Sequence, residues 1–245
     1  GLQDAYSGRM MGSFAQQTAD DNEFTREQMD AYAIESLNRA CAAIKNGSLK
    51  AETAPVTVSS RSGETIVTDD EQPLKASIEK IPTLRPAFAK DGTITAANAS
   101  SISDGASAMV LMSEKALKET GATPMARIVA HTRQSLEPAL FTTAPVGAMQ
   151  KLLAKTGWSK DDVDLWEINE AFAMVTMLAI RDLELDHAKV NVHGGACAQG
   201  HPVGSTGARI IISLMYALKQ YGKKRGIASL CIGGGEALAV AIELV

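Results

Sequence analysis

The sequence lacks the features of several special protein classes. Of its 245 residues only 4% are aromatic, and only three are cysteines: Cys41, Cys197 and Cys231. An odd, sparse set of cysteines in a chain of this length is not the framework of a disulfide-stapled secreted domain. We therefore expect reduced thiols and a cytoplasmic protein.

Long hydrophobic runs and blocks of like charge are also missing. The longest apolar helix candidate, residues 210–218, stops at Lys219, short of the about 20 residues that span a bilayer. The first residues show no basic region followed by an apolar stretch, as an export signal would. The 24 basic and 28 acidic residues are scattered and give a net charge of −4. We expect neither a membrane nor a nucleic acid as partner.

The second part of the chain alternates between the two kinds of regular structure. Hydrophobic residues make up 45% of the sequence, enough to fill a sizeable core. Strands are expected at residues 106–112, 126–130, 165–168, 190–192, 227–232 and 237–244. Helices are expected from a cap at Ser113 to Gly121, and over residues 145–157, 171–183 and 203–218. This order predicts an α/β fold with a largely parallel sheet whose last two strands are antiparallel.

The first hundred residues carry fewer elements. Residues 1–22 have no clear period and are predicted to be a loop. Thr25 and Gln28 form a capping box that starts a helix ending near Gly47. Alternation on both sides of residues 61–63 predicts a β-hairpin. This part of the chain is therefore expected to be an appendage to the sheet core.

Three polar side chains fall at or just beyond the ends of predicted strands. They are Asn169, His201 and Cys231, and open α/β sheets place ligands at this edge. Pro202 suits the first position of a helix, whose positive end would keep His201 neutral and able to accept a proton. The Cys231 thiol can shuttle a proton, and the NH of Gly233 can bind an oxyanion. This combination indicates acyl transfer.

Simpler interpretations compete with this one. A buried cysteine is usually a small hydrophobic residue, and a histidine beside proline is often structural. A zinc site of His193, Cys197, His201 and Cys231 lacks the paired ligand spacing of such sites, so no metal is expected. Residues 204–207 lack the Lys-Ser/Thr of a phosphate-binding loop.

The motifs together resemble a known family. Asn169-Glu170-Ala171-Phe172, Gly200-His201-Pro202 and Cys231-Ile232-Gly233-Gly234-Gly235 are similar to the three carboxyl-terminal signatures of the thiolases. The similarity extends to residues 84–88, 92–100 and 104–106 in family order, so it covers nearly the whole chain.

The resemblance implies a layered α/β/α fold of two similar halves with an inserted loop domain that holds coenzyme A. Residues 1–102 resemble part of that loop domain, residues 103–124 the tail of the amino-terminal core, and residues 125–245 the carboxyl-terminal core. It also implies that the chain lacks the amino-terminal half with its acyl-carrying cysteine, which none of the three cysteines matches. On that basis we expect the chain alone to be inactive and the missing half to be a partner.

The resemblance also implies roles for individual residues. His201 would take the proton of the nucleophile and, with a water on Asn169, stabilise a thioester oxyanion. Cys231 would remove or return a proton at the carbon next to the carbonyl, and the NH of Gly233 would complete a second oxyanion hole. The residues implied along coenzyme A or the acyl chain are Leu2, Met11, Phe88, Ala96, Ser100, Ala171 and Phe172. Lys75 stands where many relatives have an arginine near the nucleotide.

We therefore expect an acyltransferase that condenses two acetyl-CoA to acetoacetyl-CoA and CoA, with the thioester as substrate and no further cofactor. The run Gly233-Gly234-Gly235 favours this over the alternative, a degradative 3-ketoacyl-CoA thiolase of fatty acid metabolism. A non-catalytic acyl-CoA or lipid-binding relative is a third possibility. The resemblance implies a homodimer or homotetramer.

Overall fold

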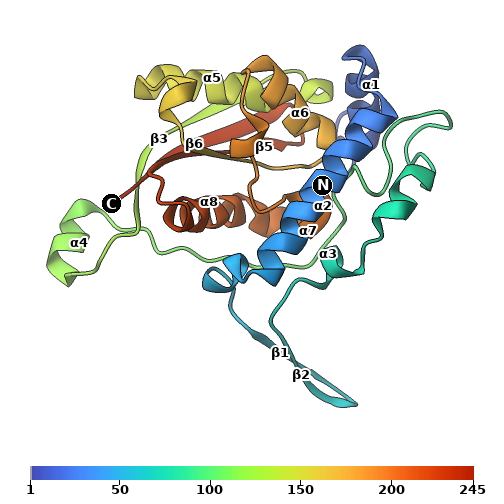
Figure 1. Cartoon of the computed structure of the whole chain (residues 1–245). Coiled ribbons are helices and arrows are strands. Elements are labelled where there is room, and N and C mark those ends of the chain that lie inside the picture. Colours follow the sequence, from blue (N-terminus) through green and yellow to red (C-terminus); the bar gives the residue numbers. More distant parts are fainter. Residues whose placement is uncertain (1) are drawn as a thin grey trace.

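A four-stranded mixed sheet forms the centre of the protein. The computed structural model describes residues 2–245, so Gly1 of the first predicted segment lies outside it. The strand order is β3 (Ala126–Ser135), β6 (Glu236–Leu244), β5 (Arg225–Ile232), β4 (Leu165–Ile168), and Figure 1 labels β3, β6 and β5. The β4–β5 ladder is parallel, whereas β6 runs antiparallel to both β5 and β3.

Helices cover both faces of this sheet. Helices α5 (Ala144–Thr156) and α6 (Ala173–Asp182) lie on one face and α8 (Val203–Gln220) on the other (Figure 1). Alternate residues of β4 serve the two layers, because Leu165 packs in the cluster with α8 and Trp166 in the cluster with α5. The strand is buried throughout. The expected layered α/β/α architecture is thus confirmed.

Local signals placed many element ends correctly. Both hydrogen bonds of the Thr25–Gln28 capping box are present at the start of α2 (Arg26–Lys45). The Ser113 side chain accepts a hydrogen bond from the first turn of α4 (Glu114–Thr120). Such caps satisfy backbone NH groups that a helix start leaves unpaired, so they mark the boundary in the sequence itself.

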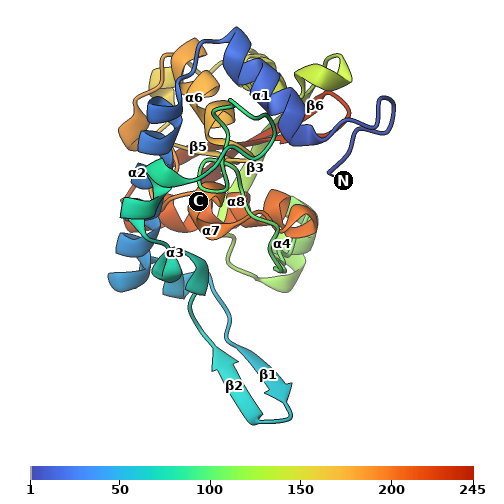
Figure 2. The ribbon, with the colours of Figure 1, turned by 90° about the vertical axis from the view of Figure 1, so that its right-hand side faces the viewer.

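The predicted hairpin projects away from the body of the protein (Figure 2). It consists of β1 (Val56–Ser60) and β2 (Gly63–Val67), and every residue of both strands is exposed. The remaining short helices are α3 (Glu71–Lys75), α7 (Ala196–Gln199) and the 3-10 helices η1 (Ser48–Ala51), η2 (Ile78–Thr83), η3 (Pro138–Leu140), η4 (Lys160–Asp162) and η5 (His187–Lys189). None of the helices within residues 2–245 has the length and apolarity needed to cross a membrane.

The prediction of a loop over residues 1–22 is wrong, because Met11–Asp21 forms helix α1. Its buried face includes polar side chains, which hide the apolar period. Gln16 is buried yet its Oε1 accepts hydrogen bonds from the backbone NH groups of Thr93 and Ile94, at 2.9 and 3.1 Å. A buried polar side chain whose hydrogen bonds are made fits a core position, but in the sequence it looks like a surface residue.

The prediction of a largely parallel sheet is also wrong. Residues 106–112 belong to no helix or strand in the described chain, and Val190 adds only an isolated parallel bridge to Trp166. Only the β4–β5 ladder of the sheet is parallel. A strand exists only where a neighbour supplies hydrogen bonds, and the apolar character of residues 106–112 does not reveal whether that neighbour is present.

Candidate active site

Asn169 and Cys231 lie at the same edge of the sheet. Ile168 pairs with Ser229 in the parallel ladder, and the backbone NH of Asn169 donates to the carbonyl of Ser229 at 2.9 Å. Cys231 stands two residues further along β5, near its carboxyl end. Because neighbouring parallel strands end at one edge, the two side chains belong to one region of the molecule, as the sequence predicted.

His201 reaches this region through the segment around Ser101. Its backbone NH donates to the carbonyl of Ser101 at 3.0 Å, and the NH of Ser100 donates to the carbonyl of Ala171 at 3.1 Å. Ala171 is two residues from Asn169. The hydrogen bonds therefore link the His201 turn to the end of β4 through one intervening strand-like segment.

The imidazole of His201 has a defined tautomer. Its Nδ1 lies 2.6 Å from Oγ1 of Thr206, and that hydroxyl donates its own proton to the carbonyl of Pro202 at 3.0 Å. Thr206 therefore accepts from Nδ1, which leaves Nε2 as the free acceptor of the ring. Burial, and then the charge of Arg209, lower the pKa of His201 to about 4. The histidine is neutral at pH 7, as predicted, with burial as the main cause.

Asn169 is buried with an exposed fraction of 2%, yet neither its Oδ1 nor its Nδ2 has a hydrogen-bond partner among the described residues. A buried amide left unpaired costs about 1–3 kcal/mol for each group. Such a side chain at the end of a strand, at the same sheet edge as Cys231, is chemically suited to hold a water or a substrate carbonyl.

Cys231 is buried as well, and burial raises the pKa of its thiol to about 12. The thiol is therefore protonated at neutral pH, and it can donate a proton more readily than it can accept one. The chain turns sharply after it, with positive φ at Gly234 and Gly235. A methyl group at Gly233 would stand 3.5 Å from Sδ of Met11, so Met11 lies beside this turn.

The other residues predicted along the substrate are mostly joined by contacts. The carbonyl of Leu2 accepts a hydrogen bond from the NH of Met11 at 2.9 Å. The rings of Phe88 and Phe172 meet edge to face with their centres 6.1 Å apart. The hydroxyl of Ser100 donates to the carbonyl of Ala171 at 3.0 Å. Met11, Phe88, Ala171, Phe172 and Cys231 belong to one hydrophobic cluster.

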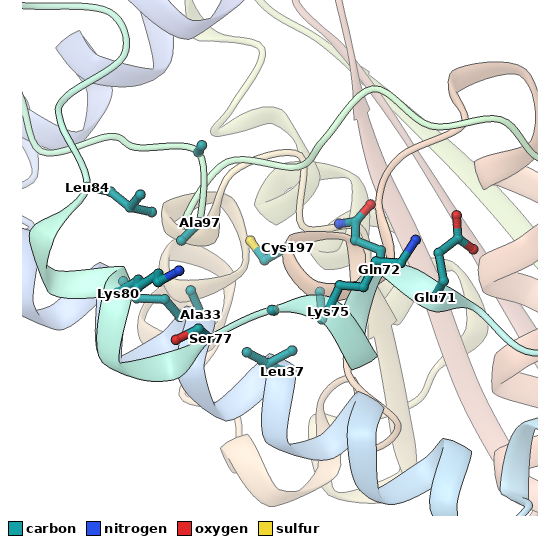
Figure 3. A pocket seen from close by; sticks show the side chains of 14 residues that line it. Ala33, Leu37, Glu71, Gln72, Lys75, Ser77, Lys80, Leu84, Ala97 and Cys197 are labelled. Carbon is teal, nitrogen blue, oxygen red and sulfur yellow. The ribbon is translucent and has the colours of Figure 1, made fainter.

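Ala96 lies apart from the polar trio. It lines a cavity of about 510 Å³ between α2, α3, η2 and α7, with Cys197 and the lysines Lys75 and Lys80 in its wall (Figure 3). Asn169, His201, Cys231 and Gly233 do not line this cavity. Lys75, which the resemblance implied near the nucleotide, and Ala96 thus share one cavity, which Asn169, His201 and Cys231 do not line.

Sequence reasoning missed the role of Glu170. Its fully buried carboxylate accepts four hydrogen bonds: from Tyr32 Oη (2.9 Å), Ser36 Oγ (2.7 Å), Asn191 Nδ2 (2.9 Å) and the NH of Cys197 (3.0 Å). The network fixes α2 and α7 against the end of β4, next to Asn169. The available signal was the i, i+4 spacing of Tyr32 and Ser36, which places two donors on one face of a helix.

No group of three or more histidine, cysteine, aspartate or glutamate side chains within residues 2–245 is placed to hold a metal ion. The zinc alternative built from His193, Cys197, His201 and Cys231 therefore has no support in the structure.

Two buried thiols give a direct test of the site's electrostatics. In the native protein at pH 8, Cys231 is expected to react with a maleimide roughly 100- to 1,000-fold more slowly than in the unfolded chain, and Cys197 more slowly as well, because burial raises both thiol pKa values and only the thiolate reacts. Mass spectrometry of timed samples, with protein in guanidinium as control, measures this. Equal native and unfolded rates at Cys231 would contradict its buried position.

Comparison with known proteins decides the family. Residues 122–244 match the family model "Thiolase, C-terminal domain", and residues 1–115 match "Thiolase, N-terminal domain". The chain belongs to the thiolase family. A probable acetyl-CoA acetyltransferase of Dictyostelium discoideum is 46% identical over 99% of this chain and 59% of its own length.

Solved structures share the fold. The acetyl-CoA acetyltransferase of Bacillus anthracis superimposes on this thiolase chain with a TM-score of 0.96 at 43% identity. The match covers 100% of this chain and 62% of the Bacillus anthracis chain. Human mitochondrial 3-ketoacyl-CoA thiolase gives a TM-score of 0.92 at 38% identity, again over 100% of this chain and 62% of its own. The chain thus spans about three-fifths of the length of these relatives.

The match to the N-terminal domain corrects one expectation. The expectation that the chain lacks the amino-terminal half, which would be a separate partner, conflicts with the match of residues 1–115 to the family model of that domain. The expectation that the chain alone is inactive rested on this missing half and is not supported.

Proposed function

We propose that this thiolase chain takes part in the reversible condensation of two acetyl-CoA to acetoacetyl-CoA and CoA. Thiolase-type acyl transfer is the reaction of the family to which it belongs. The observation that carries the proposal is the meeting of Asn169 and Cys231 at one sheet edge, with the His201 turn tied to it through Ser100 and Ser101. A neutral imidazole, an unpaired buried amide and a thiol are the groups that proton transfer at a thioester requires.

The proposed roles follow from the protonation states. His201 takes the proton of the nucleophile at Nε2, the free acceptor of its ring. Asn169 holds a water that, together with His201, binds the thioester oxyanion. Cys231, protonated at rest, returns a proton to the carbon next to the carbonyl, and in the opposite direction its thiolate removes one. The NH of Gly233 binds the second oxyanion.

The coenzyme is proposed to lie along the first part of the chain. Residues 1–102 would hold it, with residues 103–124 and 125–245 belonging to the two cores. The contacts proposed for coenzyme A or the acyl group are Leu2, Met11, Phe88, Ala96, Ser100, Ala171 and Phe172. Support comes from the contact of Met11 with the Gly233 turn and from the Phe88–Phe172 pair. The lysines in the cavity beside Ala96 offer positive charge for phosphates.

Two further proposals concern the setting. The three free cysteines support a reducing compartment such as the cytoplasm. A homodimer or homotetramer is proposed from family membership alone.

A degradative 3-ketoacyl-CoA thiolase is the second candidate, supported by the similarity to the human mitochondrial enzyme of that name. The two differ in acyl length. The rate of thiolysis of acetoacetyl-CoA compared with that of 3-ketooctanoyl-CoA separates them. We expect a kcat/KM at least about tenfold higher for acetoacetyl-CoA, which corresponds to about 1.4 kcal/mol.

The outcomes of this assay are distinct. A preference for the longer substrate would replace the first candidate with the second. Thermal stabilisation by acetyl-CoA without turnover of either substrate, and without exchange of its methyl protons, would identify a binding protein. If acetyl-CoA does not stabilise the protein and neither substrate is turned over, the proposed function is overturned.

A further inference from the structure

The carbonyl of Gly200, directly before His201, is held by a side chain of α8. Nη1 of Arg209 donates to this carbonyl at 2.9 Å. Gly200 has φ +80° and ψ 175°, a backbone conformation that suits glycine and that other residues rarely adopt. A turn in such a conformation persists only if its surroundings fix it, and here Arg209 supplies a charged hydrogen bond at its centre.

The guanidinium of Arg209 is half-buried and faces carboxyl groups from three segments: Glu167 of β4, Asp70 at the start of α3, and Glu52 after η1. Glu170 faces it as well. No ion pair joins Arg209 to any of them within residues 2–245. Burial raises the pKa of Glu167 well above its ordinary value and that of Glu52 to about 7.

The protonation of these carboxyl groups matters for the neighbouring ring. Burial disfavours the charged form of Glu167, and none of these carboxyl groups forms an ion pair with Arg209 in the part of the chain that the structure describes. The charge of Arg209 acts on His201, the residue that directly follows the anchored carbonyl of Gly200. Besides burial, Arg209 is the group that lowers the pKa of His201.

We propose that Arg209 is a positioning residue for His201: its guanidinium anchors the Gly200 carbonyl, and its positive charge opposes protonation of the imidazole. The anchor holds the turn in which Nδ1 of His201 lies against Oγ1 of Thr206. The catalytic consequence rests on the proposed function of His201, whereas the anchor and the electrostatic effect do not.

The test is an NMR titration of the His201 ring in the full chain. Arg209→Gln and Arg209→Met remove the charge, and Arg209→Lys retains it on a shorter reach. Both neutral variants are expected to raise the His201 midpoint by about 0.5–1 pH unit, and the lysine variant by less. Arg127→Met is the matched control, since it removes one positive charge from an exposed ion pair on β3, and it should leave the midpoint unchanged. Folded neutral variants with the wild-type midpoint would overturn the proposal.

A second measurement covers variants that do not fold. In Arg209→Lys, the loss of the Gly200 anchor is expected to speed hydrogen exchange of the His201 backbone NH, which donates to Ser101, at least about tenfold. Unchanged exchange together with an unchanged midpoint would overturn the proposal. Neither measurement needs turnover, so a response to Arg209 in a protein without acyl transfer would support this inference while overturning the proposed function.

Discussion

Replacing Glu170 with alanine is expected to lower the free energy of unfolding by about 3–5 kcal/mol, because several buried hydrogen-bond donors lose their acceptor at once. The carboxylate is fully buried and accepts four hydrogen bonds. Its removal leaves two side chains of α2, the amide of Asn191 and the NH of Cys197 without an acceptor. Each buried donor left unpaired costs about 1–3 kcal/mol, and partial relaxation keeps the total below their sum.

The variant Glu170→Gln keeps the shape of the side chain but removes its charge and replaces one acceptor oxygen by an NH₂ group. Oε1 receives Tyr32 and Asn191 whereas Oε2 receives Ser36 and the NH of Cys197, so in either amide orientation an NH₂ group faces two donors. We expect a loss of about 1–3 kcal/mol. Glu137→Ala is the control, because that glutamate is exposed, and it should change stability by less than about 0.5 kcal/mol. Urea unfolding followed by circular dichroism measures all three. Wild-type stability in Glu170→Ala would contradict the proposed weight of this network.

The sequence predicted that Asn169 and Cys231 lie at one sheet edge, but it did not predict the hydrogen-bond partners of Glu170. The carboxyl ends of neighbouring parallel strands lie at one edge of the sheet, so residues that follow predicted strands can be placed there from the sequence. The partners of Glu170 on α2 lie 134 and 138 residues away. The i, i+4 spacing of Tyr32 and Ser36 places two donors on one helix face, but it does not identify the distant carboxylate that accepts from them.

The two mispredicted segments show the limit of periodicity. Helix α1 buries Gln16 and Thr18, so its inner face does not read as apolar. Residues 106–112 do read as apolar, yet Val110 and Leu111 are 83% and 71% exposed. The periodicity of apolar side chains indicates which face of an element is buried. A β-ladder depends in addition on a second strand that supplies hydrogen bonds. Cap residues depend only on the first turn of their own helix, and the helix starts at Thr25 and Ser113 were therefore predicted correctly.

Replacing Cys231 with alanine is expected to slow the exchange of the methyl protons of acetyl-CoA with D₂O by about 10²–10⁴-fold, the usual contribution of a positioned acid or base. The proposed base is the thiolate, whose fraction rises about tenfold per pH unit below the thiol pKa of about 12. We therefore expect the protein-catalysed rate to rise about tenfold per unit between pH 7 and 9. His201 stays neutral throughout this range because its pKa is about 4, so the slope reports the thiol.

Cys197→Ala is the matched control, since Cys197 is buried in the same hydrophobic cluster as Cys231. Its thiol lies 3.9 Å from the carbonyl of Glu170 and has no proposed role in proton transfer. This variant should keep the wild-type rate, measured by NMR after subtraction of the buffer rate at each pH, because hydroxide alone gives the same slope. A loss in Cys197→Ala as large as in Cys231→Ala would mean that packing of the cluster, and not proton transfer at Cys231, limits exchange. A wild-type rate in Cys231→Ala would remove the thiol from the proposed mechanism.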